Sequence, residues 1–303
     1  MAELSCPGLP ASWLNGWLAA LGATVLVPEM RLSWTDGPAA HAVLAIDDAR
    51  DPLTVLVAAW PSTERIAQMP IAEAWRDCDP TEPKMPLSVF VERARSGRSH
   101  PDIWSLSSTY SDLDGIEAKN GTVEVARSKF ASAAPGSNRT VHFRLQRVHG
   151  KVEDPTEQVA ATLRGEPQRV EANGLGFDVT RITSLGDESA KRVDPVVEVL
   201  AFFGLARLPL RGLGVTSRGA GESGRESARQ AGWQRGPDDP RLRFFWPAWK
   251  QPLGCNGVDA LLDVWDPHRP ATWHRLGVHF AWKSVEFIWQ GNDTTRGIGS
   301  EAL

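Results

Sequence analysis

The chain has 303 residues, of which 42% are hydrophobic and 23% charged, and a formal net charge of −4, as is typical of a soluble globular protein. No apolar run approaches the roughly 18–20 residues that a membrane helix needs, so we expect no membrane contact. Three cysteines in no paired spacing argue against a disulfide framework. Together with an N-terminus that lacks a secretory signal, they predict a cytoplasmic protein.

The first hundred residues predict a short helix and then an antiparallel meander. Ser12 is a suitable N-cap for a helix over 14–21 with apolar residues on one face, and Gly22 would end it. Strand-like runs follow at 23–27, 30–34, 41–46 and 53–60. Their connections are too short for parallel crossovers, so we expect antiparallel pairing.

Beyond these strands the predicted elements are spaced more widely. They are a helix at 86–97, a strand at 103–110, a loop at 131–139, a helical segment at 153–167 and a strand at 177–182. Asp194 and Pro195 then supply an N-cap and a first-turn proline for a second apolar helix, which Gly204 would end.

The last hundred residues contain a stretch rich in glycine, serine and arginine at 216–236. This stretch is either a disordered insertion or a loop that orders on a partner. Ordered structure is expected again at 242–249, followed by a short helix at 258–265. Alternating apolar residues over 276–289 predict a long strand or a terminal hairpin.

Two stretches far apart in the chain, residues 14–28 and 196–209, share one design. In each, an apolar helix reaches a glycine and gives way to a strand-like run. Glycine readily takes the left-handed conformation that ends a helix, so we expect two equivalent helix–glycine–strand corners. The pair fits either two lobes or one core built twice.

Together these elements predict an α+β fold with antiparallel sheets and short helices, arranged as two lobes. We place an N-terminal α+β lobe at residues 1–150 and a C-terminal α+β lobe at residues 151–303. An arginine-rich loop at 205–243 belongs to the second lobe.

The familiar catalytic and cofactor motifs are missing from the sequence. There is no Gly-x-Ser-x-Gly elbow and no P-loop, and Gly174 and Gly176 lack the third glycine of a dinucleotide fingerprint. The spacing of His268, His274 and His279 does not place them on one helix face, and no Cys or acidic partner completes a zinc site. We therefore expect a protein that is not an enzyme and holds neither a cofactor nor a metal.

A basic segment contrasts with the acidic average of the chain. Residues 205–250 contain nine basic and four acidic residues, whereas residues 1–100 contain eight basic and twelve acidic ones. Arginine suits bidentate contacts with phosphate, and aromatic rings offer flat faces on which bases stack. The nucleic-acid-binding residues that we predict are Arg207, Arg211, Arg218, Arg225, Arg229, Arg235, Arg241, Arg243, Trp246, Trp249 and Arg296.

Each part of this prediction has a structural alternative. Phe244, Phe245 and Trp246 also suit the core of a strand, and the arginines also suit a solubilising surface. Arg296 lies in a polar, glycine-rich ending that either presents backbone donors or frays. The excess of arginine and tryptophan is also what a GC-rich gene produces, and the chain has thirteen Trp but one Tyr.

A family resemblance attaches to the run Asp194-Pro-Val-Val-Glu198-Val-Leu200-Ala-Phe-Phe-Gly204-Leu-Ala-Arg207. It resembles a Pro-x-x-Glu-Leu-Leu-Ala-x-x-Gly-Leu signature in the large-subunit proteins of type I-G (formerly I-U) CRISPR Cascade. There the signature precedes an arginine-containing stretch and a Trp-Pro-like segment, to which Phe245-Trp-Pro-Ala-Trp249 is similar. The Thr295-Arg-Gly ending, the helix before Gly22 and the chain length also resemble the family's shorter form. The opening Cys6-Pro-Gly-Leu-Pro10 departs from its usual Asn-Pro-Gly.

The resemblance implies a non-catalytic role in a multi-subunit complex of antiviral defence. The chain would contact the 5′ handle of a guide RNA, help recognise the motif that flanks a target DNA, and bind other Cascade subunits. Base pairing would read the target itself. Two alternatives stay open from the residues alone: a metal-dependent nuclease or other hydrolase with an unrecognised acidic site, and a structural subunit that docks on proteins through exposed tryptophans.

Overall fold

The computed structural model describes residues 1–67, 141–172, 192–208, 242–290 and 294–303, with shorter pieces at 84–86, 88, 116–118, 122–124, 174–175, 210–211, 229–230 and 232–235. Within these residues the fold is α+β and every strand pair is antiparallel, which confirms the predicted fold class. None of the described helices combines the length and apolar character that a membrane-spanning segment requires. Several predicted elements lie wholly or largely outside the described residues, namely those at 86–97, 103–110, 131–139, 177–182 and 216–236.

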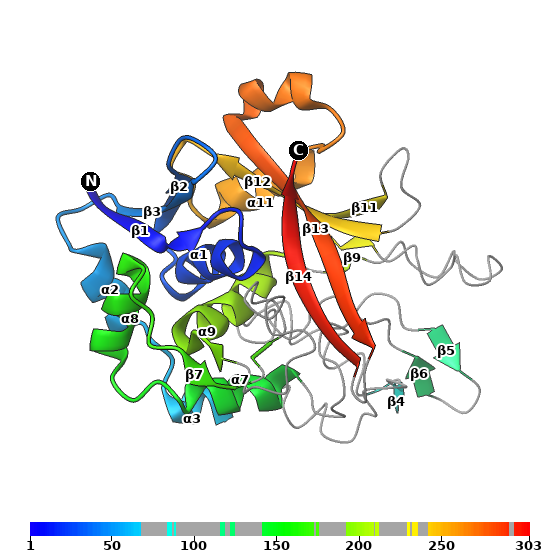
Figure 1. The fold of residues 1–303 in the computed structure, drawn as a ribbon, viewed down its shortest axis with the longest axis horizontal. Coiled ribbons are helices and arrows are strands. Elements are labelled where there is room, and N and C mark those ends of the chain that lie inside the picture. Colours follow the sequence, from blue (N-terminus) through cyan, green and yellow to red (C-terminus); the bar gives the residue numbers. More distant parts are fainter. Residues whose placement is uncertain are drawn as a thin grey trace.

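Two sheets dominate the strand structure. The first has the order β1-β3-β2 and contains β1 (Ala2–Pro10), β3 (His41–Ile46) and β2 (Arg31–Trp34). The second has the order β11-β12-β13-β14 and contains β11 (Trp233–Arg235), β12 (Leu242–Trp249), β13 (Val278–Gln290) and β14 (Thr294–Ala302). In Figure 1, β13 and β14 form one long ribbon in orange and red. These strands confirm the strands predicted at 30–34 and 41–46 and the long strand predicted at 276–289.

Smaller sheets complete the strand structure of the described residues. One has the order β4-β6-β5 and contains β4 (Lys84–Pro86), β6 (Thr122–Glu124) and β5 (Ile116–Ala118). The other two are single pairs, β7 (Val170–Glu171) with β8 (Arg192–Val193), and β9 (Leu210–Arg211) with β10 (Arg229–Gln230).

Aspartate followed by proline begins three of the helices. The carboxylates of Asp51, Asp154 and Asp194 each accept hydrogen bonds from two backbone N–H groups of the first turn. The described helices are α1 (Leu14–Leu26), α2 (Pro52–Ala58), α3 (Thr63–Ala67), α7 (Val141–His149), α8 (Pro155–Arg164), α9 (Pro195–Gly204) and α11 (Cys255–Val264). The 3-10 helices η3 (Leu205–Arg207) and η5 (Pro270–Leu276) follow α9 and α11. The helices predicted at 153–167, after Asp194 and at 258–265 are confirmed.

One predicted strand is a helix. The valine- and leucine-rich run at 53–60 predicts a strand, but residues 52–58 form α2. Asp51 accepts from the N–H groups of Leu53 and Thr54, and Pro52 has the backbone angle of a first helical turn. This local capping outweighs the strand preference of the β-branched residues.

The prediction of two helix–glycine–strand corners is also wrong, because neither glycine ends its helix in a left-handed conformation. α1 continues through Gly22 to Leu26, so the strand expected at 23–27 is absent. Gly204 keeps a helical φ of −60°, and η3 extends the turn beyond it. Every residue of both helices is buried, as expected for helices that are apolar all round.

The two helices pack directly on each other at the centre of the molecule (Figure 1). A Cβ atom at Gly22 would lie 1.8 Å from the carbonyl oxygen of Leu200. A Cβ atom at Gly204 would lie 2.0 Å from the carbonyl oxygen of Leu18. Both positions therefore need glycine because the two backbones touch there.

The core does not divide at the lobe boundary that we placed at residue 150. A single cluster of buried residues includes α1 from the first half of the chain and α9, β12 and α11 from the second. The sequence similarity of the two corners thus corresponds to one shared core in which each half contributes a central helix.

Candidate nucleic-acid interface

The arginine-rich segment leaves the core at the end of α9 and returns to it at β12. Between these points the structure describes the β9–β10 pair and strand β11, while Arg218, Arg225 and Arg241 lie outside the described residues. In β9–β10, Arg211 and Arg229 occupy positions directly opposite each other. The register thus places two of the predicted nucleic-acid-binding residues on adjacent strands at the same level of the pair.

Arg207, at the start of the segment, is held by an ion pair. Its Nη1 lies 2.9 Å from Oδ2 of Asp259 in α11, and its side chain is 19% exposed. An arginine that is mostly buried and paired with a carboxylate serves to attach the segment to α11. The ion pair leaves little of the Arg207 side chain open to a phosphate.

The remaining described arginines lie on the second sheet. Arg235 is exposed and stands on β11, which is an edge strand of that sheet. Arg243 is half-buried on β12, opposite Gln234. Arg296 is part of β14, opposite Ile288, so the glycine-rich ending forms a paired strand rather than a frayed terminus.

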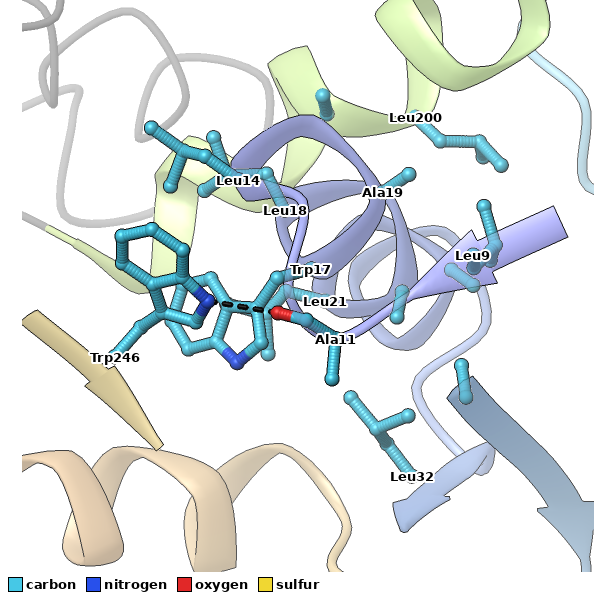
Figure 2. Packing of buried hydrophobic residues seen from close by; sticks show 14 of the residues in the cluster. Leu9, Ala11, Leu14, Trp17, Leu18, Ala19, Leu21, Leu32, Leu200 and Trp246 are labelled. Carbon is cyan, nitrogen blue, oxygen red and sulfur yellow. Dashed lines mark hydrogen bonds between the residues drawn. The ribbon is translucent and has the colours of Figure 1, made fainter. Parts of the chain in front are cut away.

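Trp246 and Trp249 are core residues, as the structural alternative proposed for their segment. Neither has any exposed surface on which a base could stack. The indole N–H of Trp246 donates to the carbonyl oxygen of Ala11 at 2.8 Å, and that of Trp249 donates to the carbonyl oxygen of Leu32 at 2.8 Å. Figure 2 shows Trp246 pointing into the cluster around α1.

The second sheet buries one face against α1, while its other face is partly covered, since Phe245 of that face is 4% exposed. On one face Trp246, Trp282 and Ser284 are at most 4% exposed, and Phe244 of this face packs edge-on against Trp17 of α1. On the other face Lys283 and Val285 of β13 are half-buried. This outer face also carries Arg243, because Arg243 has the same parity as Phe245, the register partner of Lys283.

A pair of buried carboxylates marks the start of α9. Asp194 is 4% exposed, and burial raises its pKa to about 6 even though it accepts hydrogen bonds from two backbone N–H groups and the Thr162 hydroxyl. Glu198 is fully buried and accepts from the backbone N–H of Leu175. A Cβ atom at Gly174 would lie 2.6 Å from Oε2 of Glu198, so this loop closes tightly over the carboxylate. These contacts anchor the loop at 174–175 to α9.

The three histidines singled out in the sequence do not converge. His268 packs edge-on against the ring of Phe245, and His274 is exposed on η5. His279 lies 3.1 Å from the carbonyl oxygen of Thr35 through Nε2, and burial holds its pKa below the usual value. In the part of the chain that the structure describes, no group of three His, Cys, Asp or Glu residues could hold a metal ion.

No protein-family model matches this chain, and no curated protein or solved structure shows significant similarity to it.

Proposed function

We propose that this chain is a non-catalytic nucleic-acid-binding protein, and that it acts as the large subunit of a type I CRISPR effector complex. In that role it contacts the guide RNA, the flanking motif of the target DNA, or both. The observation that carries the proposal is the register of β9 and β10, which sets Arg211 directly opposite Arg229.

Two like charges at opposite positions of an antiparallel pair repel each other and weaken the pairing. The β9–β10 pair has two residues in each strand, so this position makes up half of the pair. A phosphate group that binds both guanidinium groups would convert the repulsion into two charge-assisted contacts. A nucleic-acid backbone supplies such phosphates in series, and the exposed Arg235 on the edge strand β11 of the second sheet supplies a further cation.

The effector-subunit role draws its support from the resemblance and from the place of its signature in the fold. The signature forms α9, which packs against α1 in the buried centre of the molecule. The arginine-rich segment begins where α9 ends, and the Arg207–Asp259 ion pair attaches it there. A basic loop anchored at both ends on a rigid core is well suited to hold a nucleic acid in one place.

Binding of labelled RNA and DNA to the purified chain, followed by fluorescence anisotropy over a series of salt concentrations, tests the nucleic-acid role. We expect the double variant Arg211→Ala/Arg229→Ala to bind more weakly and to reduce the slope of log K against log salt by about two. The matched control is Arg50→Ala/Arg164→Ala, which removes the same charge from exposed arginines outside the segment and leaves the slope unchanged. Equal binding by the two double variants, or no binding by the unaltered chain at low salt, would refute the role.

Co-expression with a guide RNA and the other subunits of a type I-G effector complex tests the proposed complex. We expect the chain to co-purify with them and to be lost from the complex when the arginines are replaced. Retention of protein partners without any nucleic acid, even at low salt, would instead favour the docking alternative.

A further inference from the structure

The hydrogen-bond pattern of the first sheet fixes which backbone groups of β1 face outward. β1 is an edge strand, because the order of the sheet is β1-β3-β2. At the opposite edge, Leu32 of β2 exchanges both backbone hydrogen bonds with Leu253, so its N–H and C=O point away from β3. Backbone groups of successive residues in an antiparallel strand point to opposite edges. Leu44 lies opposite Leu32 and Leu4, so the backbone groups of Leu44 and Leu4 face each other.

The residues on either side of Leu4 therefore direct their backbone groups to the free edge. Glu3 and Ser5 each present one N–H and one C=O there, both residues are exposed, and no described residue pairs with these groups. The free edge is short, because Pro7 has no N–H to donate. At Gly8 a Cβ atom would lie 1.7 Å from the carbonyl oxygen of Thr162, so α8 covers β1 from that point.

A second copy of β1 fits this edge in one antiparallel register. With Glu3 opposite the partner's Ser5, every N–H and C=O that Glu3 and Ser5 direct outward is used on both copies. A register with Glu3 opposite the partner's Glu3 would set like charges against each other. A register with Ser5 opposite the partner's Ser5 would place Glu3 against a proline that cannot donate. The favoured register is symmetric, so the same patch serves both copies.

The side chains support the same register. Leu4 is half-buried and packs against the core, and it would meet the partner's Leu4 in a non-hydrogen-bonded pair, where side chains are closest. Glu3 makes no ion pair with any described residue. The Oγ atom of Ser5 lies 2.8 Å from Nε2 of His41. When His41 donates through Nε2, the Ser5 hydroxyl proton is left for the carboxylate of the partner's Glu3.

We propose that the outer edge of β1 docks a second copy of this chain, so that the two β1 strands join two sheets into one continuous sheet. Addition of a strand to a sheet edge is a recurring mode of protein association, in which the main chain supplies most of the contacts. The edge is short, so the dimer is a reversible one with a dissociation constant on the order of 10–100 µM. The inference goes beyond the proposed function and does not depend on it.

Sedimentation velocity of the purified chain over a range of concentrations tests the dimer. We expect the unaltered chain to pass reversibly from monomer to dimer. Glu3→Pro removes an outward N–H and leaves the β1–β3 ladder intact, since proline is tolerated where the N–H of an edge strand faces solvent. Two hydrogen bonds are lost per dimer, so the dissociation constant should rise roughly 10- to 100-fold.

Glu3→Ala is the matched control, because it removes the same side chain and keeps the backbone N–H. Its dissociation constant should stay within about fivefold of that of the unaltered chain. If Glu3→Pro dimerises as strongly as Glu3→Ala, the β1 edge is not the docking site. An unaltered chain that stays monomeric up to about 500 µM would overturn the dimer.

Cysteine crosslinking tests the register and does not require the proline variant to fold. Directly opposite residues of a non-hydrogen-bonded pair have Cα atoms about 4.5 Å apart, which is within the range of a disulfide. We therefore expect Leu4→Cys to form a covalent dimer under mild oxidation. Glu3→Cys should not, because its two copies are out of register with each other.

The unaltered chain is the control for the native thiols, of which Cys6 is fully buried and Cys255 is half-buried. Crosslinking of Glu3→Cys as fast as Leu4→Cys would overturn the register. If neither variant crosslinks at a concentration where the unaltered chain is dimeric, the two copies meet elsewhere and the docking edge is overturned. Nucleic-acid binding is not measured in these experiments, so their failure leaves the proposed function standing.

Discussion

Gly22 and Gly204 form one reciprocal contact across the centre of the molecule. A side chain on Gly22 would collide with the carbonyl oxygen of Leu200, four residues before Gly204, and a side chain on Gly204 would collide with the carbonyl oxygen of Leu18, four residues before Gly22. The relationship is the same in both directions. α1 and α9 therefore meet as equivalent partners, although they come from opposite halves of the chain.

Replacing either glycine by alanine should force the helices apart. We expect Gly22→Ala to lower the free energy of unfolding by on the order of 3 kcal/mol, because overpacking the contact outweighs the roughly 1 kcal/mol that alanine adds to helix preference. Gly204→Ala should cost a similar amount. Once one methyl group has separated the helices, the second should lower the free energy of unfolding by less. The double variant should therefore lose less stability than the two single variants lose together.

Urea unfolding of the two single variants and the double variant measures these effects. Gly254→Ala is the control, because no atom lies within 4 Å of a Cβ at Gly254. Its free energy of unfolding should stay within about 1 kcal/mol of the unaltered chain. A Gly22→Ala variant as stable as this control would show that the helices do not touch in solution.

The glycines also show where sequence reasoning reaches its limit. The shared pattern of an apolar helix and a glycine is visible in the sequence, and it correctly places both helices. The role of the glycine is not visible, because a glycine that ends a helix and one that lets another helix approach look the same locally. Only the packing of residues about 180 positions apart decides between them.

The Asp-Pro capping signals mark helix starts correctly, whereas the cap predicted at Ser12 is wrong, because α1 begins after Trp13 without a side-chain cap. Asp194-Pro195 placed the start of α9 correctly, since the cap is a contact within four residues. The same signal at Asp51-Pro52 begins α2, although the valines and leucines that follow it are typical of a strand. Local chemistry that satisfies backbone N–H groups is better evidence for an element than composition is.

The candidate site was less predictable than the fold. Charge alone identified the arginine-rich segment, but it could not tell that Arg207 pairs with Asp259 on α11. Aromatic content pointed to Trp246 and Trp249, whereas their buried indole N–H groups contact the carbonyl oxygens of Ala11 and of Leu32 in β2.

Asp194 should contribute more to the stability of the protein at low pH than at neutral pH. Its folded pKa is raised to about 6, above the value of about 3.9 in an unfolded chain. The folded state therefore holds the proton more tightly, and its contribution to stability is full below about pH 4 and lost as the pH rises through 6. Two units of pKa correspond to on the order of 3 kcal/mol.

Asp194→Asn isolates this contribution. The Oδ1 atom of Asp194 accepts all three hydrogen bonds, from Val196, Val197 and Thr162, and the amide oxygen of asparagine can accept the same three. We expect the variant to be more stable than the unaltered chain at pH 7, similar at pH 4, and flatter in between when urea unfolding is measured across this range. A variant that is less stable at pH 7 would contradict the raised pKa.

Trp246→Phe should destabilise the fold and leave binding unchanged. The substitution removes the donor to the carbonyl oxygen of Ala11 and leaves that buried oxygen without its hydrogen bond. We expect a loss of about 2–3 kcal/mol in the free energy of unfolding. Trp13→Phe, at an exposed position, should cost little. If the folded Trp246→Phe variant bound nucleic acid more weakly, Trp246 would take part in binding and would not be a core residue alone.

Arg207→Ala distinguishes an anchoring arginine from a phosphate contact. Its ion pair with Asp259 is partly screened by solvent, since the Asp259 side chain is 41% exposed. A double-mutant cycle with Arg207→Ala and Asp259→Ala should therefore give a coupling of about 0.5–1 kcal/mol in unfolding. The salt slope of nucleic-acid binding should not change, whereas Arg211→Ala should lower it by about one. A lower slope for Arg207→Ala, without coupling to Asp259, would mean that the ion pair opens to receive a phosphate.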